Sequence, residues 1–236
     1  MDTPNVKDAV REHYVTIARS GGSCCGPNCG CNSGTDQEVL SVMMSDEYTN
    51  ADHQIVAAAD LGLGCGTPTA FADLKPGMIV LDLGSGAGID VFIAAKAVAP
   101  TGKAIGLDMT DEMLKRARAN KAKLGITNAE FWQGDIENMP VESYSIDRII
   151  SNCVINLAPD KRKVLSEMYR VLKPGGKFTV SDIVSIGEVP DAVKRNIELW
   201  AGCIAGALGK DEFLQITKEA GFKDLIISSE TPGFPR

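Results

Sequence analysis

Cysteine is the residue type in this sequence whose number and spacing most clearly suggest chemistry. Four of the seven cysteines fall in the stretch SCCGPNCGC at residues 23 to 31, which is too rich in Gly and Pro to fold by itself. The other three, Cys65, Cys153 and Cys203, are widely separated. In a reducing compartment we expect such residues to be free thiols, metal ligands or redox catalysts and not a structural disulfide framework.

Composition limits where these thiols act and on what. The chain has 236 residues, of which 44% are hydrophobic and 23% charged, and its net charge is −7. No basic amino-terminal region precedes an apolar run, and no run approaches the roughly 18 apolar residues of a membrane span. A pI near 4.9 argues against a surface for the phosphate backbone of a nucleic acid. We therefore expect a soluble, cytoplasmic protein with no membrane and no nucleic-acid partner.

A helix is predicted for the first twenty residues, with Thr3 as its N-cap and Gly21 at its end. Its apolar face is formed by residues at helical spacing, which are Val6, Val10, Tyr14 and Ile17. The cysteine-rich segment follows as a loop. The capping-box spacing of Thr35 and Glu38 predicts a short helix after that loop.

Beyond Lys75, apolar runs alternate with helix-patterned segments. The runs are MIVLDLG, KAIGLDM, AEFWQGD, SIDRIIS, KFTVSDI and DLIISS, and helical patterns separate the first five. This alternation predicts an α/β fold, with a mostly parallel sheet and helices on both faces. We therefore expect a helical, cysteine-rich extension and lead-in over residues 1–74 and a sheet domain over 75–236, with an insert around 185–210 after the fifth run.

The first apolar run ends in LDLGSGAG, a glycine-rich turn before a helix. Gly84, Gly86 and Gly88 let the backbone turn sharply and approach a ligand closely. A dinucleotide-binding fingerprint would need its third glycine one position later, where Ile89 stands. The pattern resembles instead motif I of class I S-adenosylmethionine methyltransferases, in which Asp82 is the acidic residue, and Ser85 lies within the turn. The alternative is a tight turn of any α/β protein.

The following runs also end in residues that S-adenosylmethionine would need. Asp108 could accept hydrogen bonds from both ribose hydroxyls, and Met109 could pack on the adenine. Asp135 could accept from the adenine amino group while Ile136 covers the ring, and Ser151 at the end of the fourth run is a further expected contact. Taken singly, each aspartate could equally be a helix N-cap or a turn residue.

The fourth run indicates what is methylated. SNCVINL has neither the Pro-Pro-aromatic signature of amino methyltransferases nor a Pro-Cys pair, but it places Cys153 where the methyl group should be presented. WAGCIAGAL places Cys203 on a helical segment of the insert, and Cys65 comes immediately before the sheet. Each cysteine by itself could be only a small buried hydrophobic residue.

Together these stretches resemble the arsenite S-adenosylmethionine methyltransferase family, in a short prokaryotic-type form. The motifs GLGCGTP, LDLGSGAG, GLDMT, SNCVINLAPDK and CIAGAL carry the resemblance over roughly residues 60 to 222, and LKPGG resembles class I methyltransferases in general. It implies a Rossmann-like class I methyltransferase fold in which Cys65, Cys153 and Cys203 bind trivalent arsenic. Two departures are expected: the additional carboxyl-terminal domain of longer members is absent, and ETPGFPR is too short for the seventh strand.

The resemblance also implies that an amino-terminal cysteine takes part in redox turnover. Arsenic rises by two in formal oxidation state when its lone pair takes a methyl group, and a dithiol that becomes a disulfide returns two electrons. A disulfide between the adjacent residues Cys24 and Cys25 would be strained, so we expect one of them to pair with Cys65 instead. Thioredoxin or glutathione would then reduce that disulfide. Cys29 and Cys31 are spare or resolving thiols on this hypothesis.

Two other interpretations remain open at this point. One is a different small-molecule C- or O-methyltransferase with incidental thiols. The other is a catalytically silent, thiol-based metal or metalloid binder, including a structural zinc protein. The Cys-Cys-x-x-x-Cys-x-Cys spacing of residues 24 to 31 is not the usual Cys-x-x-Cys pair of a zinc site.

Overall fold

The computed structural model describes most of the sheet domain and the first helix. The residues described are 3–20, 48, 53–187, 189–190, 193, 199–200 and 202–231. The cysteine-rich segment, and with it Cys24, Cys25, Cys29 and Cys31, lies outside the described residues. The helix predicted from Thr35 also lies outside them.

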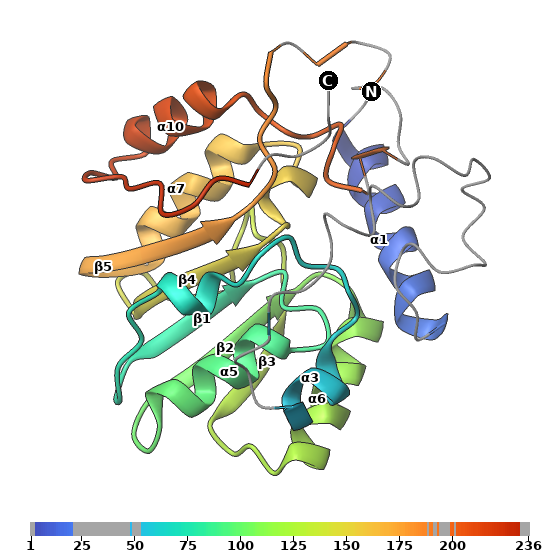
Figure 1. Cartoon of the computed structure of the whole chain (residues 1–236), viewed down its shortest axis with the longest axis vertical. Coiled ribbons are helices and arrows are strands. Elements are labelled where there is room, and N and C mark those ends of the chain that lie inside the picture. The colour runs from blue at the N-terminus through green and yellow to red at the C-terminus, as the bar shows by residue number, and fades with distance from the viewer. Residues whose placement is uncertain are drawn as a thin grey trace.

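Five parallel strands form one sheet in the order β3-β2-β1-β4-β5 (Figure 1). The strands are β1 (Ile79–Leu83), β2 (Lys103–Asp108), β3 (Ala129–Gln133), β4 (Ile146–Asn152) and β5 (Leu172–Ser181). Every neighbouring pair is parallel, as the first five apolar runs predict. Parallel pairing requires crossover helices, so both faces of the sheet become buried.

Helices cover both faces of the sheet, and the α/β prediction is confirmed. One face packs against α3 (His53–Ala59), α4 (Pro68–Phe71), α5 (Ile89–Val98) and α6 (Asp111–Leu124). The other packs against α7 (Lys161–Val171) and α10 (Lys210–Glu219). Within the described ranges, no helix is long and apolar enough to cross a membrane.

Helix α7 lies between the fourth and fifth apolar runs, where the sequence predicts a helix. Asp160 caps the helix, since its side chain accepts a hydrogen bond from the Lys163 N–H at 3.0 Å. Its apolar side chains are buried against the sheet, namely Val164, Leu165, Met168 and Val171.

Helix α1 (Thr3–Ser20) has the predicted apolar face, and it lies across the carboxyl ends of the strands (Figure 1). Val6 and Val10 are buried in a cluster with Cys153, Leu157 and Cys203. Its remaining apolar residues pack near α6, where Ile17 contacts Met113. The helix was predicted from its own pattern, but its place over the thiols was not.

The strand predicted at DLIISS is wrong. Residues 225 to 230 have no strand assignment, and Ile226 and Ile227 are 84% and 47% exposed. A strand requires backbone hydrogen bonds to a neighbour. This run is paired with no strand among the described residues, so its apolar composition alone does not make it part of the sheet.

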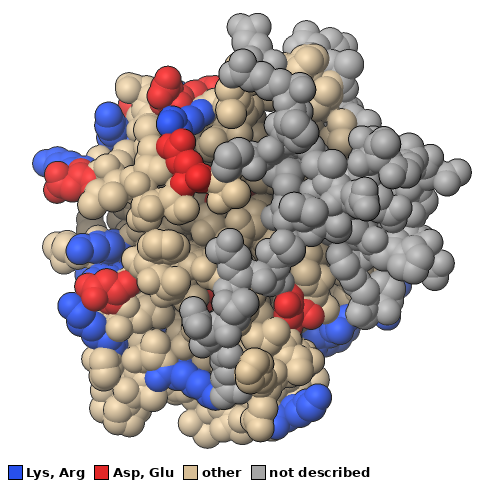
Figure 2. Space-filling model, in the orientation of Figure 1, with Lys and Arg blue, Asp and Glu red and all other residues tan. Residues whose placement is uncertain are grey.

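Charged side chains of both signs are interspersed on the face shown in Figure 2. Elsewhere on the described surface, oppositely charged side chains form ion pairs, such as Lys103 with Glu130 at 2.8 Å. The described part of this face therefore carries both positive and negative side chains.

The packing of α7 provides a test of the fold. Leu165 is fully buried and Ser166, the next residue, is exposed. Leu165→Ala should lower the free energy of unfolding by about 2–5 kcal/mol, because it leaves a cavity in the core. Ser166→Ala should change it by less than about 0.5 kcal/mol. Urea titrations of the two variants would measure both values, and equal effects would contradict this packing.

Candidate active site

The glycine-rich turn leaves β1 and opens one wall of a pocket at the carboxyl edge of the sheet. Its glycines have positive φ angles of 67° at Gly84, 51° at Gly86 and 98° at Gly88. A Cβ at Gly84 would overlap Val154, and one at Gly88 would lie 2.9 Å from Phe92 and Phe131. A Cβ at Gly86 would meet nothing within 4 Å, so this backbone is open toward the pocket and accessible to a ligand.

Asp108, at the end of β2, is tied to this turn. One carboxylate oxygen accepts the Gly86 N–H at 2.9 Å, and the other accepts the Thr110 N–H at 2.8 Å. Burial raises the pKa of Asp108, and these backbone donors oppose that rise. Burial, together with the charges of Asp90 and Asp108, also raises the pKa of Asp82. The pocket wall thus includes the carboxyl groups of Asp82, Asp90 and Asp108, which come from neighbouring elements.

The pocket has the features that an adenosyl group requires. Met109 and Ile136 form apolar parts of its wall, as the sequence predicts, and Asp108 and Asp135 supply acceptors for hydroxyl and amino groups. Gly86 leaves space at the turn where a side chain would intrude. The residues present therefore fit S-adenosylmethionine.

Asp135 is engaged by a residue that the sequence analysis did not identify. Lys7 of α1 donates to Asp135 at 2.6 Å and to Glu137 at 2.7 Å, and it lines the pocket together with Tyr14. Partial burial acts to raise the pKa of Asp135, but the bonds from Lys7 and from the Glu137 N–H outweigh it and leave the pKa lowered. Asp135 therefore ties α1 to the predicted adenine side of the pocket.

Two predicted cofactor residues with hydroxyl groups are buried. Ser85 lines the pocket, whereas Ser151 is fully buried in β4 and is not part of the pocket wall. Neither hydroxyl oxygen has a hydrogen-bond partner among the described residues. Gly88 is likewise behind the wall, at the start of α5. Cofactor contact stays a prediction for all the predicted residues, and Ser151 and Gly88 do not line the pocket.

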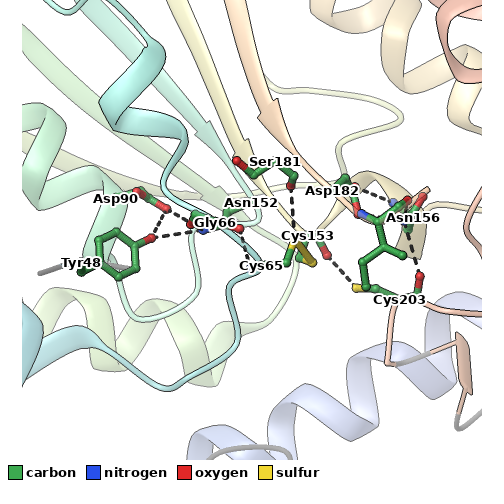
Figure 3. Close-up of a disulfide and its surroundings, with 11 residues drawn as sticks. Tyr48, Cys65, Gly66, Asp90, Asn152, Cys153, Asn156, Ser181, Asp182 and Cys203 are labelled. Carbon is green, nitrogen blue, oxygen red and sulfur yellow. Dashed lines mark hydrogen bonds between the residues drawn. A yellow bond between two sulfur atoms is a disulfide. The ribbon is translucent and has the colours of Figure 1, made fainter. Parts of the chain in front are cut away.

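Cys65, Cys153 and Cys203 converge beside the pocket, although 88 residues separate the first two in sequence (Figure 3). Cys65 and Cys153 form a disulfide with their Cα atoms 5.9 Å apart. The Cys203 thiol is buried and donates to the Cys153 carbonyl oxygen at 2.8 Å. Cys153 itself lines the pocket. The three sequence-predicted cysteines therefore lie in one region beside the pocket, two of them bonded to each other and the third in contact with the backbone of Cys153.

The backbone turns sharply at two of these cysteines. Cys153 follows β4 with φ 56°, and its N–H donates to the Ser181 carbonyl at 2.8 Å. Cys203 has φ 63° and lies in a turn, so the prediction that it sits on a helical segment is wrong. The left-handed conformation breaks the helical repeat just after Trp200, whose carbonyl accepts the Cys203 N–H at 2.9 Å. Non-glycine residues adopt such φ values rarely, and often at functional sites.

Asp182, which follows β5, lies close to the Cys65–Cys153 disulfide. Ligand atoms of Asp182, Cys65 and Cys153 lie within 4.8 Å of one another. Burial raises the pKa of Asp182 to about 7, against the opposing effect of the Ile183 and Asn156 N–H donors. The sequence analysis missed this residue, although its position at the carboxyl end of a predicted strand was a usable signal.

The disulfide differs from the pairing expected from the sequence. Cys65 was expected to pair with Cys24 or Cys25, and in this structure it is bonded to Cys153. Because Cys24 and Cys25 lie outside the described residues, their pairing with Cys65 stays a prediction.

The fold and the pocket define a Rossmann-like class I methyltransferase. The chain belongs to the methyltransferase-domain family, whose model matches residues 74–221. It is 45% identical over 235 residues to an arsenite methyltransferase of Halobacterium salinarum, an alignment that covers 96% of this chain and 60% of the relative. It is 38% identical over 179 residues to the arsenite methyltransferase of Homo sapiens, covering 72% of this chain and 47% of that one.

A solved structure shows the same similarity. The crystal structure of an arsenic(III) S-adenosylmethionine methyltransferase from Chlamydomonas reinhardtii has a TM-score of 0.64 and 37% identity, and the match covers 79% of this chain and 62% of that one. The chain thus spans about 60% of the length of the Halobacterium relative.

Asp108 provides the test of the cofactor pocket. Asp108→Ala should weaken S-adenosylmethionine binding at least about a hundredfold, because it removes charge-assisted bonds and releases the Gly86 turn. Asp111→Ala, which removes a carboxylate on α6 that pairs with Lys115, should leave the affinity unchanged. Isothermal calorimetry measures both constants. Wild-type affinity in the Asp108 variant would remove this residue from the site.

Proposed function

We propose that this chain transfers a methyl group from S-adenosylmethionine to trivalent arsenic bound by Cys65, Cys153 and Cys203. The observation that carries the proposal is the meeting of these three sulfur-bearing side chains beside the pocket, with Cys153 on its wall. The similarity to arsenite methyltransferases supports the choice of substrate.

The donor set suits a soft substrate. Thiolate sulfur binds soft centres, and arsenic(III) keeps a lone pair after it is bound to sulfur. S-Adenosylmethionine, when bound, supplies an electrophilic methyl group. The chain's own residues hold the cofactor through Asp108 and the Gly86 turn and hold arsenic through the thiolates. Because the arsenic lone pair needs no proton removed, the main contribution of these residues is positioning.

Burial of the thiol site favours the same chemistry. Cys203 is fully buried, Cys153 is 3% exposed, and Val6 and Val10 of α1 pack against them. A buried, uncompensated thiolate is costly, whereas three thiolates on trivalent arsenic form a neutral unit. The site is therefore better suited to thiolates that are neutralised by a bound metalloid than to free ones.

Reduction of the product is the second part of the proposal. Transfer of the methyl group raises arsenic from the trivalent to the pentavalent state, and two protein thiolates return two electrons when they form one S–S bond. We assign Cys65 to this pair, with Cys24 or Cys25 as the predicted partner. The Cys65–Cys153 bond supports a redox role for Cys65, since it places that sulfur within bonding reach of a second cysteine.

External thiols would complete the cycle. Thioredoxin or glutathione in the cytoplasm would reduce the disulfide by thiol exchange, in which two external thiols become a disulfide and the protein thiols are restored. The substrates on this proposal are arsenite and its methylated trivalent products.

Serine substitutions test the arsenic anchor. Cys153→Ser and Cys203→Ser should each abolish methylation of inorganic arsenite and of monomethylarsenite, because a hydroxyl replaces a thiolate ligand. The affinity for S-adenosylmethionine should stay near the wild-type value in both variants. Product analysis by mass spectrometry, with calorimetry as the control, gives the two readouts. Residual turnover at about a tenth of normal in either variant would rule out an obligatory pair.

Cys65→Ser should separate the two substrates. Inorganic arsenite offers three positions to thiolates and monomethylarsenite offers two, which Cys153 and Cys203 can fill. The variant should lose arsenite methylation yet keep a substantial single-turnover rate with monomethylarsenite. Rapid-quench measurements on both substrates provide the comparison. Equal loss on both would refute the division of roles, and normal arsenite turnover would show that Cys65 is not needed.

A further inference from the structure

Two asparagines flank Cys153 in the sequence, and each one contacts the backbone at another cysteine (Figure 3). Asn152 bonds to the chain at Cys65, and Asn156 bonds to the chain at Cys203. The central cysteine is therefore bracketed by two side chains that reach the other two thiol-bearing segments.

Asn152 forms hydrogen bonds to the backbone at Cys65 and Gly66 through both the oxygen and the nitrogen of its side-chain amide. Its Oδ1 accepts the Cys65 N–H at 3.0 Å, and its Nδ2 donates to the Gly66 carbonyl at 2.6 Å. A side-chain amide that pairs in this way acts as a neighbouring peptide group would. Cys65 lies before the sheet and is part of no helix or strand. The two bonds from Asn152 join the backbone of Cys65 and Gly66 to the end of β4.

The orientation of the Asn152 amide is fixed by groups behind it. Its Nδ2 lies 3.4 Å from a carboxylate oxygen of Asp90 and 3.1 Å from the Tyr48 hydroxyl, which itself donates to Asp90 at 2.8 Å. An oxygen in the place of Nδ2 would face the Asp90 carboxylate and the Gly66 carbonyl, which accept but do not donate. The NH₂ group must therefore point toward Asp90, and Oδ1 is left to hold the Cys65 N–H.

We propose that Asn152 is the positioning residue that holds Cys65 next to Cys153, and that it thereby determines whether the site can use three thiolates or only two. The statement about thiolate number rests on the proposed arsenic chemistry. Because the bonds are made to the backbone, they hold Cys65 in the same place whether its sulfur is a thiol or part of the disulfide. Asn152 should therefore act both on substrate choice and on disulfide formation.

Asn156 provides an internal contrast. Its Nδ2 donates to the Ile183 carbonyl at 2.7 Å and to Asp182 at 2.8 Å and lies 3.4 Å from the Cys203 carbonyl. Asn156 therefore contacts the backbone at Cys203. On the proposed function, both arsenic substrates bind to Cys203. Loss of Asn152 should discriminate between the substrates, and loss of Asn156 should not.

The first experiment contains no arsenic. The reduced full-length protein is mixed with oxidised glutathione, so that two protein thiols become the Cys65–Cys153 disulfide and one oxidised glutathione becomes two reduced molecules. Asn152→Asp should form this disulfide about tenfold more slowly, because it loses the donor to Gly66 and places a charge beside Asp90. Mass spectrometry of alkylated peptides follows this pair separately from any pair with Cys24 or Cys25.

A matched control is available at the opposite edge of the sheet. Like Asn152, Asn128 holds the backbone through its side-chain amide: its Nδ2 donates to the carbonyls of Ala95 at 2.8 Å and Gly102 at 3.1 Å. Asn128→Asp should lower stability to a similar extent but leave the rate of disulfide formation unchanged. Asn152→Leu, which removes both bonds without adding a charge, is the second variant in case the aspartate variant does not fold.

The second experiment compares substrates. Asn152→Asp should lose arsenite methylation at least about tenfold while monomethylarsenite turnover and S-adenosylmethionine affinity stay within about twofold of wild type. Asn156→Ala should lose both substrates. Wild-type disulfide formation in the Asn152 variants, or equal loss on both substrates, would overturn the inference. A matching loss of cofactor affinity would also overturn it, since Asn152 would then be a cofactor ligand.

Failure of the proposed function would look different. If Cys153→Ser still methylated arsenite, the thiol site would not be the arsenic site, and substrate comparison would no longer report on Asn152. The rate of disulfide formation would still decide whether Asn152 positions Cys65.

Discussion

The pairing of β1 with both β2 and β4 is the interaction on which the site depends. It sets the glycine turn after β1 beside Asp108 at the end of β2 on one side and Cys153 at the end of β4 on the other. Because all the strands are parallel, their carboxyl ends meet at one edge, where loops rather than strands face the ligand. The pairing of β5 with β4 then adds Asp182 to the same edge. Cofactor pocket and thiols are adjacent because the strands that carry them are adjacent.

This arrangement concentrates acidic groups in a buried place. Burial raises the pKa of Asp82, Asp90 and Asp108, with that of Asp90 raised to about 6 despite the hydrogen bond from Tyr48. Carboxylates in such surroundings favour a positively charged ligand and disfavour additional negative charge. A sulfonium cofactor on one side, and thiols that are protonated, oxidised or neutralised by a metalloid on the other, both satisfy that constraint.

Much of the fold could be predicted because its signals are local. Five apolar runs became strands, and the apolar face of α1 has the predicted residues. The strand prediction at DLIISS failed because composition does not reveal whether a run forms backbone hydrogen bonds to a neighbouring strand. Cys203 was placed on a helix because its neighbours suit one, whereas in the structure it has a positive φ and its thiol donates to the carbonyl of Cys153, which is distant in sequence.

The predicted site residues also divide into those with a local sequence signal and those whose place depends on contacts distant in sequence. Gly84, Gly86, Asp108 and the three cysteines could be identified because residue type and strand-end position are visible in the sequence. Lys7 could not, since its role comes from the docking of α1 over Asp135, and a surface lysine on a helix has no distinguishing pattern.

Asn152 and Asn156 illustrate a further limit of sequence reasoning. Both are in SNCVINL, a stretch that drew attention for its cysteine, but an asparagine beside a strand end is most often a turn residue. Their roles depend on which way each amide points, and that is decided by Asp90 and Asp182, carboxylates from elsewhere in the chain. Because a carboxylate only accepts hydrogen bonds, it turns each NH₂ group toward itself. The Oδ1 of Asn152 is then free to accept the Cys65 N–H. Asp90 thus helps to position Cys65 through Asn152, without a contact of its own to that cysteine.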